Sequence, residues 1–170
     1  MDGTSRTHAL IDTSVLLNFL AVDQARLLGL HPAYRFVVTD HVRGEITDRR
    51  PERLQRFETA ISNDTFDLVS VTGLDELAIF GTLMSEGRLD IGESAAAARA
   101  ICHGLPLATD DRRAQKIVAR LFPQLVIVDT PSIMQDLIRA AVVTVDRANQ
   151  LKSDWETHHR FRMTFEKFTA

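Results

Sequence analysis

Cysteine is almost absent from this sequence, since Cys102 is the only one among 170 residues. A single cysteine cannot form an intrachain disulfide, so no oxidising compartment is implied. We interpret Cys102 as a small apolar residue on a helix, because no activating context stands beside it. No apolar run approaches the roughly 18 residues of a membrane span. The segment Met1–Arg6 lacks the apolar stretch of a signal peptide, and we therefore expect a cytoplasmic protein with no membrane partner.

Several motifs of cofactor or covalent chemistry are also missing. Neither a GxGxxG nor a GxxxxGKS/T loop occurs, which weakens nucleotide-cofactor hypotheses, and there is no GxSxG nucleophile motif. No histidine pair has the spacing of a zinc site, since His158 and His159 are adjacent in the chain. A formal net charge of -3 excludes a polybasic nucleic-acid coat but leaves a local basic patch open.

The rest of the composition is that of a globular protein. Hydrophobic residues make up 45% and charged residues 25%, which argues against a disordered chain. The length is that of one domain, and the chain contains no internal repeat, low-complexity tract or Pro-rich linker. We therefore expect a single domain over residues 1–170.

Short apolar runs alternate along the chain with longer segments of helical period. β-branched and aromatic residues, with turn residues at their ends, predict strands. The expected strands are 8–12, 34–39, 66–71, 105–109 and 125–129. Strands that alternate with helices imply crossover connections and a parallel sheet with helices on both faces. The predicted fold class is therefore α/β, a three-layer Rossmann-like fold with a central parallel sheet of about five strands.

Two helix starts carry clear signals. Thr130 followed by Pro131 predicts an N-cap and a first helical residue, opening a helix through about Ala141. Asp90 and Glu93 have the spacing of a capping box that leads into an alanine-rich helix.

Other segments are predicted from their apolar patterns. Thr144 is expected to open a helix whose apolar stripe belongs either to the core or to an interface. The alternation over 161–165 predicts a final short strand or a docking segment. A further helix is expected to stop at Glu86-Gly87. The two apolar stripes are Val145, Ala148, Leu151 and Trp155, and Leu74, Leu77, Ala78 and Met84.

Acidic residues recur just after the expected strands, where an open parallel sheet binds its ligands. Asp12 follows the first strand, and Asp110 and Asp111 follow the fourth. Glu45 lies after the second strand, and Glu93 begins the helix that precedes the fourth. Carboxylates crowded at one sheet edge raise one another's pKa, so a cation must neutralise them. Mg²⁺ or Mn²⁺ prefers such oxygen ligands, and the cluster therefore suggests phosphodiester hydrolysis.

Each acid also has a purely structural explanation. Asp12 could cap the next helix, and Glu45 could be a solvated helix residue. The third position of a capping box explains Glu93 without a metal. Asp110 and Asp111 compete, because one could cap a helix while the other faces the site. The hypothesis of a site depends on the common placement of these acids.

A basic stripe leads away from this acidic region. Arg112, Lys116 and Arg120 are spaced four residues apart on the helix expected after Asp111. Such a stripe suits a nucleic-acid backbone, although a solvated helix face explains the same pattern.

Four stretches of the sequence resemble the PIN-domain proteins, and more narrowly the VapC-like ribonucleases of toxin–antitoxin systems. They stand in the family's order over roughly residues 8–130, which we take as the core, with C-terminal helices and a tail over 131–170. These stretches are ALIDTSVLL (9–17), VVTDHVRGE (37–45), LDIGESAAAA (89–98) and LATDDRRA (107–114).

The resemblance implies a role for each acid. Asp12, Glu93 and Asp111 would hold the metal, Glu45 would bind a second ion or orient the attacking water, and Ser14 would support Asp12. Asp110 would assist Asp111. The family implies Mg²⁺ or Mn²⁺ as cofactor, RNA as substrate and a homodimer, and a toxin would also have an antitoxin partner that blocks the site. Glu93 departs from the aspartate of many relatives, which moves the metal position slightly.

Three functions follow as hypotheses. The first is a metal-dependent endoribonuclease, and the second is a non-catalytic PIN module that binds RNA or protein through the same surface. Such modules tend to lose an acid, whereas all four positions are filled here. The third is a structure-selective DNA nuclease, which would share the metal site. A phosphorylatable receiver domain would need a paired acid beside Asp12 and a lysine in place of Asp129.

Overall fold

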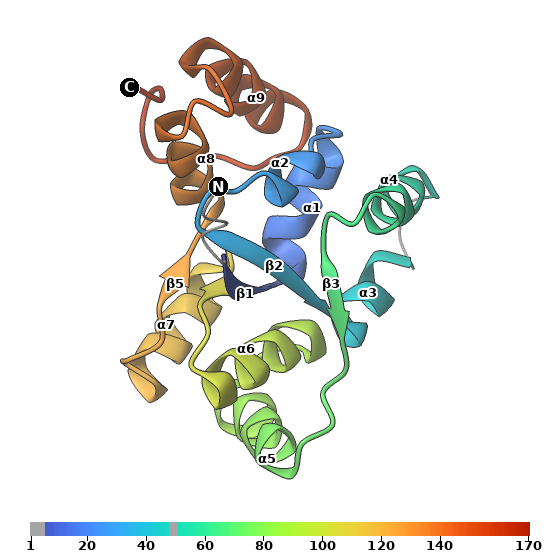
Figure 1. The fold of residues 1–170 in the computed structure, drawn as a ribbon. Helices are drawn as coiled ribbons and strands as arrows, with labels where there is room; N and C mark the ends of the chain where they lie inside the picture. Colours follow the sequence, from blue (N-terminus) through green and yellow to red (C-terminus); the bar gives the residue numbers. More distant parts are fainter. Residues whose placement is uncertain (1–5, 48–50) are drawn as a thin grey trace.

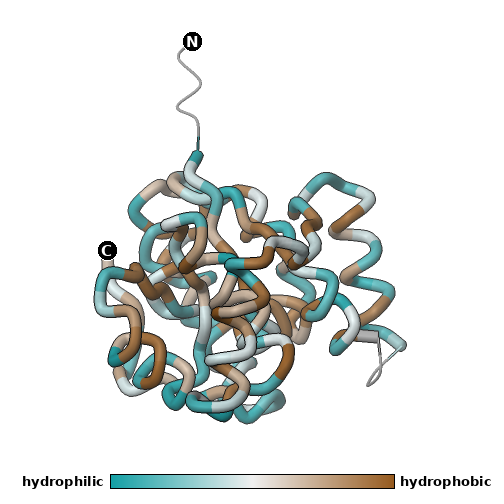
Figure 2. Tube along the Cα trace, turned by 90° about the horizontal axis from the view of Figure 1, so that it is seen from below, coloured by the Kyte–Doolittle hydropathy of each residue, from teal (hydrophilic) through white to brown (hydrophobic). Residues whose placement is uncertain are grey.

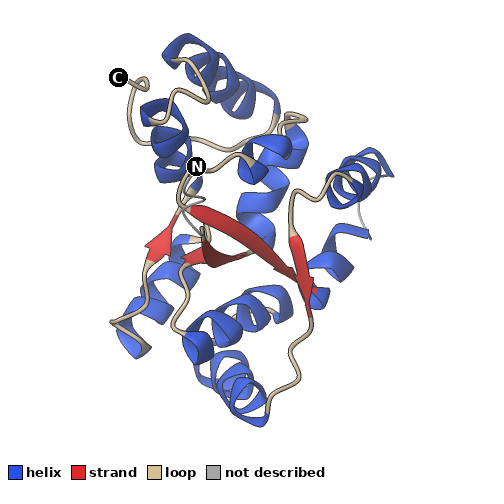
Figure 3. Ribbon diagram, viewed as in Figure 1, coloured by secondary structure: helices blue, strands red, loops and turns tan. Residues whose placement is uncertain are grey.

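The computed structural model describes residues 6–47 and 51–170. A sheet runs through the middle of the molecule with helices on both sides (Figure 3). Its strands are β1 (Thr7–Ile11), β2 (Tyr34–Thr39), β3 (Asp67–Val69), β4 (Leu107–Ala108) and β5 (Ile127–Val128). They pair in the order β3-β2-β1-β4-β5, and each pairing is parallel. The predicted three-layer α/β fold class is confirmed.

β1 and β2, with five and six residues, are the longest strands of the sheet, whereas β4 has only two residues although it pairs on both sides. β1 pairs on both sides, with β2 and β4, and its last three residues are fully buried. β3 and β5 each pair on one side alone, which leaves fewer ladder hydrogen bonds to define their ends. The expected strand 34–39 is therefore reproduced, whereas 66–71, 105–109 and 125–129 are shorter in the structure.

Nine α-helices connect and follow these strands within the described residues. Helices α1, α2, α8 and α9 lie on one side of the sheet, and α5 and α6 lie on the other (Figure 1). The helices are α1 (Thr13–Ala21), α2 (Arg26–Gly29), α3 (Asp40–Thr47), α4 (Pro51–Ser62), α5 (Leu74–Thr82), α6 (Ile91–His103), α7 (Arg112–Leu121), α8 (Thr130–Arg139) and α9 (Val145–His158). None of the helices in the described part of the chain is long and apolar enough to cross a membrane.

Two of three predicted helix starts are confirmed and one is wrong. Asp90 and Glu93 form the expected capping box of α6, and Thr144 caps α9. The N-cap of α8 is Asp129, one residue before the predicted Thr130, because the Asp129 carboxylate accepts a hydrogen bond from the Ser132 N–H at 2.9 Å. The Thr130 hydroxyl instead donates to a carboxylate at the end of β4.

The apolar stripe predicted on α5 does not face the core. Leu74 and Leu77 are 85% and 47% exposed, whereas Glu76 is buried. The Glu76 carboxylate accepts a hydrogen bond from the Arg99 guanidinium at 2.7 Å and lies 2.6 Å from the His103 ring, and these contacts set the rotation of α5 against α6. The helix continues as a π-helical turn over Leu83–Gly87 and so ends at the predicted stop, Glu86-Gly87.

The C-terminal helices share one core with the sheet. Trp155 of α9 is fully buried, packs edge-on against Phe19 of α1, and donates its indole N–H to the Asn18 carbonyl at 2.7 Å. The stripe on α9 is therefore part of the core. The tail after α9 contains no strand, so of the two alternatives for 161–165 the strand is wrong, and the segment packs on the helices through Phe161 and the buried Phe168 that follows. Apolar and polar stretches alternate along the helices, as expected of one-sided burial (Figure 2).

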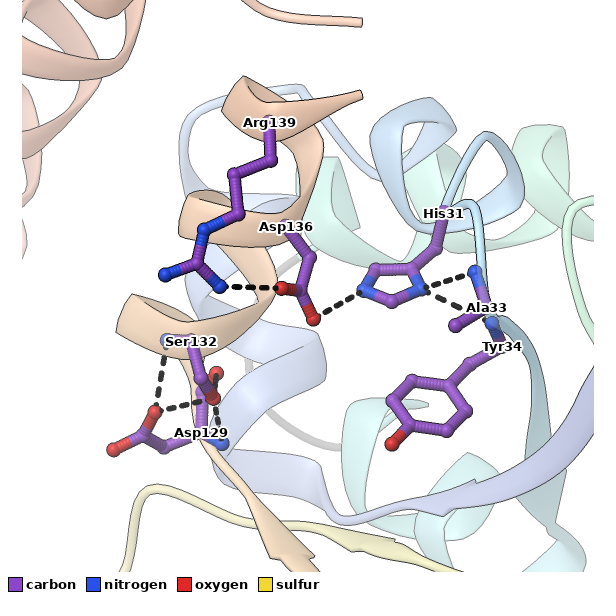
Figure 4. A network of polar contacts seen from close by, with 7 residues as sticks. All are labelled: His31, Ala33, Tyr34, Asp129, Ser132, Asp136 and Arg139. Carbon is purple, nitrogen blue, oxygen red and sulfur yellow. Dashed lines mark hydrogen bonds and ion pairs between the residues drawn. The ribbon is translucent and has the colours of Figure 1, made fainter. Parts of the chain in front are cut away.

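A buried histidine network fastens α8 to the start of β2 (Figure 4). The His31 ring accepts the N–H groups of Ala33 and Tyr34 at its Nδ1, at 3.2 and 3.1 Å. Its Nε2 faces Asp136 of α8 at 3.6 Å, and Tyr34 stacks on the ring. Burial lowers the pKa of His31, so the neutral ring is the form that the fold stabilises.

The strand order creates one topological switch. From β1 the chain moves outward to β2 and β3, then returns across the sheet to β4 on the other side of β1. In open parallel sheets, ligands bind in the crevice at the carboxyl ends of the strands beside such a switch. The residues directly after β1 and β4 therefore border the place where a ligand is expected to bind.

Candidate active site

Asp12 lies at the bottom of the crevice and is only 2% exposed. Its Oδ2 accepts hydrogen bonds from the hydroxyls of Ser14 and Thr109 at 2.7 and 3.0 Å. Its Oδ1 is buried and has no hydrogen-bond partner among the described residues. Burial raises the pKa of Asp12, although the hydroxyl donors oppose that shift. One half of this carboxylate is thus fixed and the other half is left for a ligand.

Glu45 reaches the same crevice from α3. Its Oε2 accepts a hydrogen bond from the Thr13 hydroxyl at 2.5 Å, and its Oε1 accepts one from the Gly92 N–H at 2.8 Å. Gly92 makes this contact possible, since a Cβ there would lie 2.4 Å from Glu45 Oε1. The carboxylate therefore fills the space that a side chain at the start of α6 would take.

Glu93 lies one residue further along α6 and enters the site from its N-terminus. Its Oε2 accepts the Asp90 N–H at 3.2 Å, which completes the capping box. The pKa of Glu93 is raised to about 7, first by burial and then by Asp90, with smaller contributions from Asp12 and Asp111. Glu93 therefore has both the structural role of a cap and a place in the negative field of the other acids.

Asp111 and Asp110 follow β4 but point in different directions. Asp111 is the N-cap of α7, where its Oδ1 accepts the Ala114 N–H at 2.8 Å. Asp110 is bound by Asn18 of α1, at 2.8 Å, and by the N–H and hydroxyl of Thr130, at 2.9 and 2.5 Å. The two roles are not divided between the acids as expected: Asp111 both caps α7 and lines the crevice, whereas Asp110 joins β4 to α1 and α8.

Ser14 connects the two strand ends. Its hydroxyl donates to Asp12 and accepts the Asp110 N–H at 3.0 Å. This is the supporting position that the resemblance gave to Ser14.

The acids meet around one cleft of about 410 Å³. The cleft brings together Asp12, Glu45, Glu93 and Asp111, which the sequence separates by up to 99 positions. Its lining residues are Asp12, Thr13, Ser14, Leu17, Glu45, Asp90, Ile91, Glu93 and Asp111. We call this the acidic cleft.

The donor set of the acidic cleft fits a hard divalent cation. A buried carboxylate oxygen without a partner costs free energy unless a ligand satisfies it, and Asp12 Oδ1 is such an atom. Burial raises the pKa of Glu93 most, and the negative charges of Asp90, Asp12 and Asp111 raise it further. As the side chains lie, no three Asp, Glu, His or Cys residues within 6–47 and 51–170 converge on one ion position. Glu93 and Asp111 would therefore have to rotate away from their capping hydrogen bonds to bind one.

The predicted basic stripe lies on α7, where all three side chains are exposed. Arg112, Lys116 and Arg120 begin next to Asp111, but none of them lines the acidic cleft. Their role in binding a nucleic-acid backbone stays a prediction.

Sequence reasoning missed the residues that hold the acids in place. Hydrogen bonds to the carboxylates of the acidic cleft come from the hydroxyls of Thr13 and Thr109 and from the N–H of Gly92. Gly92 also leaves room for the Glu45 carboxylate. Thr13 and Thr109 directly flank acids at strand ends, so a search for hydroxyl donors beside those acids would have found them. Gly92 gave no such signal, because its contact with Glu45 joins segments 47 residues apart.

The chain has a parallel sheet with an acidic cleft at its topological switch. Its sequence assigns it to a protein family. The sequence model of the family DUF3368, described as a PIN domain, matches residues 8–145, so the chain belongs to this PIN-domain family. The resemblance to PIN-domain proteins is thereby confirmed. No curated protein matches the chain significantly.

The matching solved structures are distant in sequence. VapBC-1 from nontypeable Haemophilus influenzae matches with a TM-score of 0.52 and 14% identity, over 73% of this chain and 98% of the other. VapBC2 from Rickettsia felis, solved bound to a DNA fragment from its promoter, matches with a TM-score of 0.48 and 12% identity, over 72% and 98%. A protein from Pyrobaculum aerophilum matches with a TM-score of 0.47 and 18% identity, over 81% and 91%.

Proposed function

We propose that the protein is a metal-dependent ribonuclease that hydrolyses phosphodiester bonds of RNA at the acidic cleft. One observation carries the proposal: the buried Oδ1 of Asp12, which has no hydrogen-bond partner in the described part of the chain, lies in a cleft lined by Glu45, Glu93 and Asp111. PIN-domain family membership adds the expectation of a nuclease. A module that had lost catalysis would be expected to have lost one of these acids.

Each acid has a separate part in the proposed reaction. Asp12, Glu93 and Asp111 would hold Mg²⁺ or Mn²⁺, which when bound neutralises negative charge on the acids and on the phosphate. Ser14 and Thr109 fix Asp12 through its Oδ2, so that Oδ1 keeps its direction. Hydroxyl donors that lock the carboxylate in this way reduce the cost of organising the site.

Glu45 would orient the water that attacks the phosphorus in line with the leaving oxygen. Thr13 and Gly92 hold its two oxygens at 2.5 and 2.8 Å, so the carboxylate cannot swing freely. Each carboxylate oxygen has lone pairs beyond the one used, and a water can donate to them. Glu45 thus accepts a hydrogen bond from the attacking water and receives its proton as the new bond forms.

The test is cleavage of a mixed single-stranded RNA pool by the intact chain and by Asp12→Asn. We expect cutting with Mg²⁺ or Mn²⁺, none with EDTA, and none with the variant. A folded, metal-supplied intact chain that cuts no RNA would refute the proposal and favour a binding module. Flapped DNA digested in parallel tests the alternative substrate, and preferential cutting of that DNA would contradict the assignment to RNA.

The remaining expectations concern partners and location. A homodimer, a small antitoxin that blocks the acidic cleft and a cytoplasmic location are implied by the resemblance to VapC-like ribonucleases. We propose them together with the nuclease activity, and gel filtration with light scattering tests the dimer.

A further inference from the structure

A second cleft, of about 360 Å³, opens beside the acidic cleft. The two share Ser14, Leu17 and Asp111, so they form one continuous depression at the carboxyl end of the sheet. The second cleft adds a wall that carries basic side chains, which the described lining of the acidic cleft does not have. Arg53 comes from α4, and His159, Arg160 and Phe161 come from the segment after α9, whereas the carboxylate of Asp110, which also lines this cleft, is already bound by Asn18 and Thr130. We call this the basic cleft.

The segment that forms this wall is anchored to the body of the protein. The Phe161 ring packs edge-on against the buried Trp155 at 6.0 Å between centroids, and the Phe161 N–H donates to the Trp155 carbonyl at 3.2 Å. Arg160 has a left-handed backbone, with φ of 58°, which turns the chain at the end of α9. Phe161 is therefore held against Trp155, which itself packs on α1.

Resting on the proposed function, we propose that the basic cleft binds the nucleotide of a single-stranded RNA that lies next to the scissile phosphate. The guanidinium groups of Arg53 and Arg160 would contact backbone phosphate, since arginine binds phosphate through paired donors. Phe161, half-buried with an accessible side, would stack an unpaired base, which is the usual aromatic contact in single-strand recognition.

The position of the basic cleft distinguishes it from the stripe on α7. Arg112, Lys116 and Arg120 line neither cleft, whereas Arg53 and Arg160 share a cleft with Asp111. A strand with its phosphate at Asp12 would pass into the basic cleft without leaving the depression. The contact is thus selective for a flexible, unpaired strand, because a duplex cannot present a single base to Phe161.

The test measures the affinity of full-length variants for a labelled single-stranded RNA in EDTA, after cleavage by the intact chain with Mn²⁺ has been established. We expect Arg53→Gln with Arg160→Gln to weaken binding about tenfold or more and to reduce the slope of log Kd against log salt by about 1.4, or 0.7 for each lost phosphate contact. Phe161→Leu, which keeps the apolar contact with Trp155, should weaken binding about fivefold or more without changing the slope.

Two controls make the result decisive. Arg147→Gln removes an exposed charge at the far end of α9 and should change neither quantity. Arg112→Gln with Arg120→Gln tests the α7 stripe. Unchanged affinity and slope in the Arg53 and Arg160 variant of a chain that cuts RNA would overturn the basic cleft alone. Absence of both cutting and binding by the intact chain would instead overturn the proposed function.

Discussion

The ends of β1 and β4 present two buried aspartates with opposite surroundings. Asp110, after β4, accepts hydrogen bonds on both oxygens, from Asn18 and Thr130. Asp12, after β1, accepts hydrogen bonds on Oδ2, whereas its buried Oδ1 has no partner among residues 6–47 and 51–170. Burial raises the pKa of both carboxyls. The difference indicates that a buried acid with every oxygen satisfied is part of the framework, whereas one left half-satisfied is available to a ligand.

The largest expected effect is on catalysis and follows from Asp12→Asn. Because Asp12 is proposed as a direct metal ligand, we expect RNA hydrolysis to fall more than 100-fold, beyond the 10- to 100-fold that an outer-shell change costs. Asp110→Asn should reduce the rate by much less. Single-turnover cleavage with Mn²⁺ measures both, and equal losses would remove the distinction between the two acids.

For the free energy of unfolding we expect the opposite order, with a larger loss in Asp110→Asn than in Asp12→Asn. Asp110→Asn replaces one of the two acceptor oxygens by an NH₂ donor, which then faces either the Thr130 N–H or the Asn18 NH₂, so we expect a loss of about 1–3 kcal/mol in the free energy of unfolding. Asp12→Asn relieves a buried, half-satisfied carboxyl and should cost less. Urea denaturation in EDTA checks this, and a more stable Asp110 variant would contradict the framework role.

Gly92→Ala tests how the acidic cleft is held together. The new Cβ would displace the Glu45 carboxylate, which is the end of a flexible side chain, so the fold should tolerate it. We expect hydrolysis to fall about 10-fold, as for loss of a supporting contact, with a change in stability below about 1 kcal/mol. Gly44→Ala, where a Cβ meets nothing within 4 Å, is the matched control. Equal rates in the two variants would show that the position of Glu45 is unimportant.

The smallest effect concerns pH and the buried His31. Its pKa is lowered in the fold from the ordinary value of 6.5, so the unfolded chain binds the proton more tightly. The stability that the neutral ring contributes is therefore present above pH 6.5 and is lost as the pH falls below it, by at most about 1.4 kcal/mol per unit. The melting temperatures of the intact chain and His31→Asn should converge between pH 8 and 5, because only the intact chain loses this contribution as acid is added. Parallel curves would refute this.

The sequence predicted the layers of the fold and the acids of the cleft for the same reason. Apolar runs with turn residues at their ends define strands, and acids placed directly after parallel strands must meet at one edge. The boundaries were less predictable, as at Asp129, because which of two adjacent residues caps a helix depends on the contact of Thr130 with Asp110 across the sheet.

The features that sequence could not predict are those that depend on contacts between distant segments. The outward stripe of α5 follows from the buried contacts of Glu76 with Arg99 and His103, which outweigh the exposure of Leu74. The contact of Gly92 with Glu45 and the placement of Arg160 beside Asp111 likewise join residues 47 and 49 positions apart. Period and propensity describe one segment at a time and carry no information on such pairs.

The most direct test of the central claim is a count of bound Mn²⁺ from the electron paramagnetic resonance signal of the free ion. The intact chain, Asp12→Asn and Asp110→Asn would be titrated side by side at neutral pH. We predict that the intact chain and Asp110→Asn bind Mn²⁺ and that Asp12→Asn loses this binding. Undiminished binding by Asp12→Asn, or no binding by the intact chain, would contradict the assignment of the acidic cleft as a metal site.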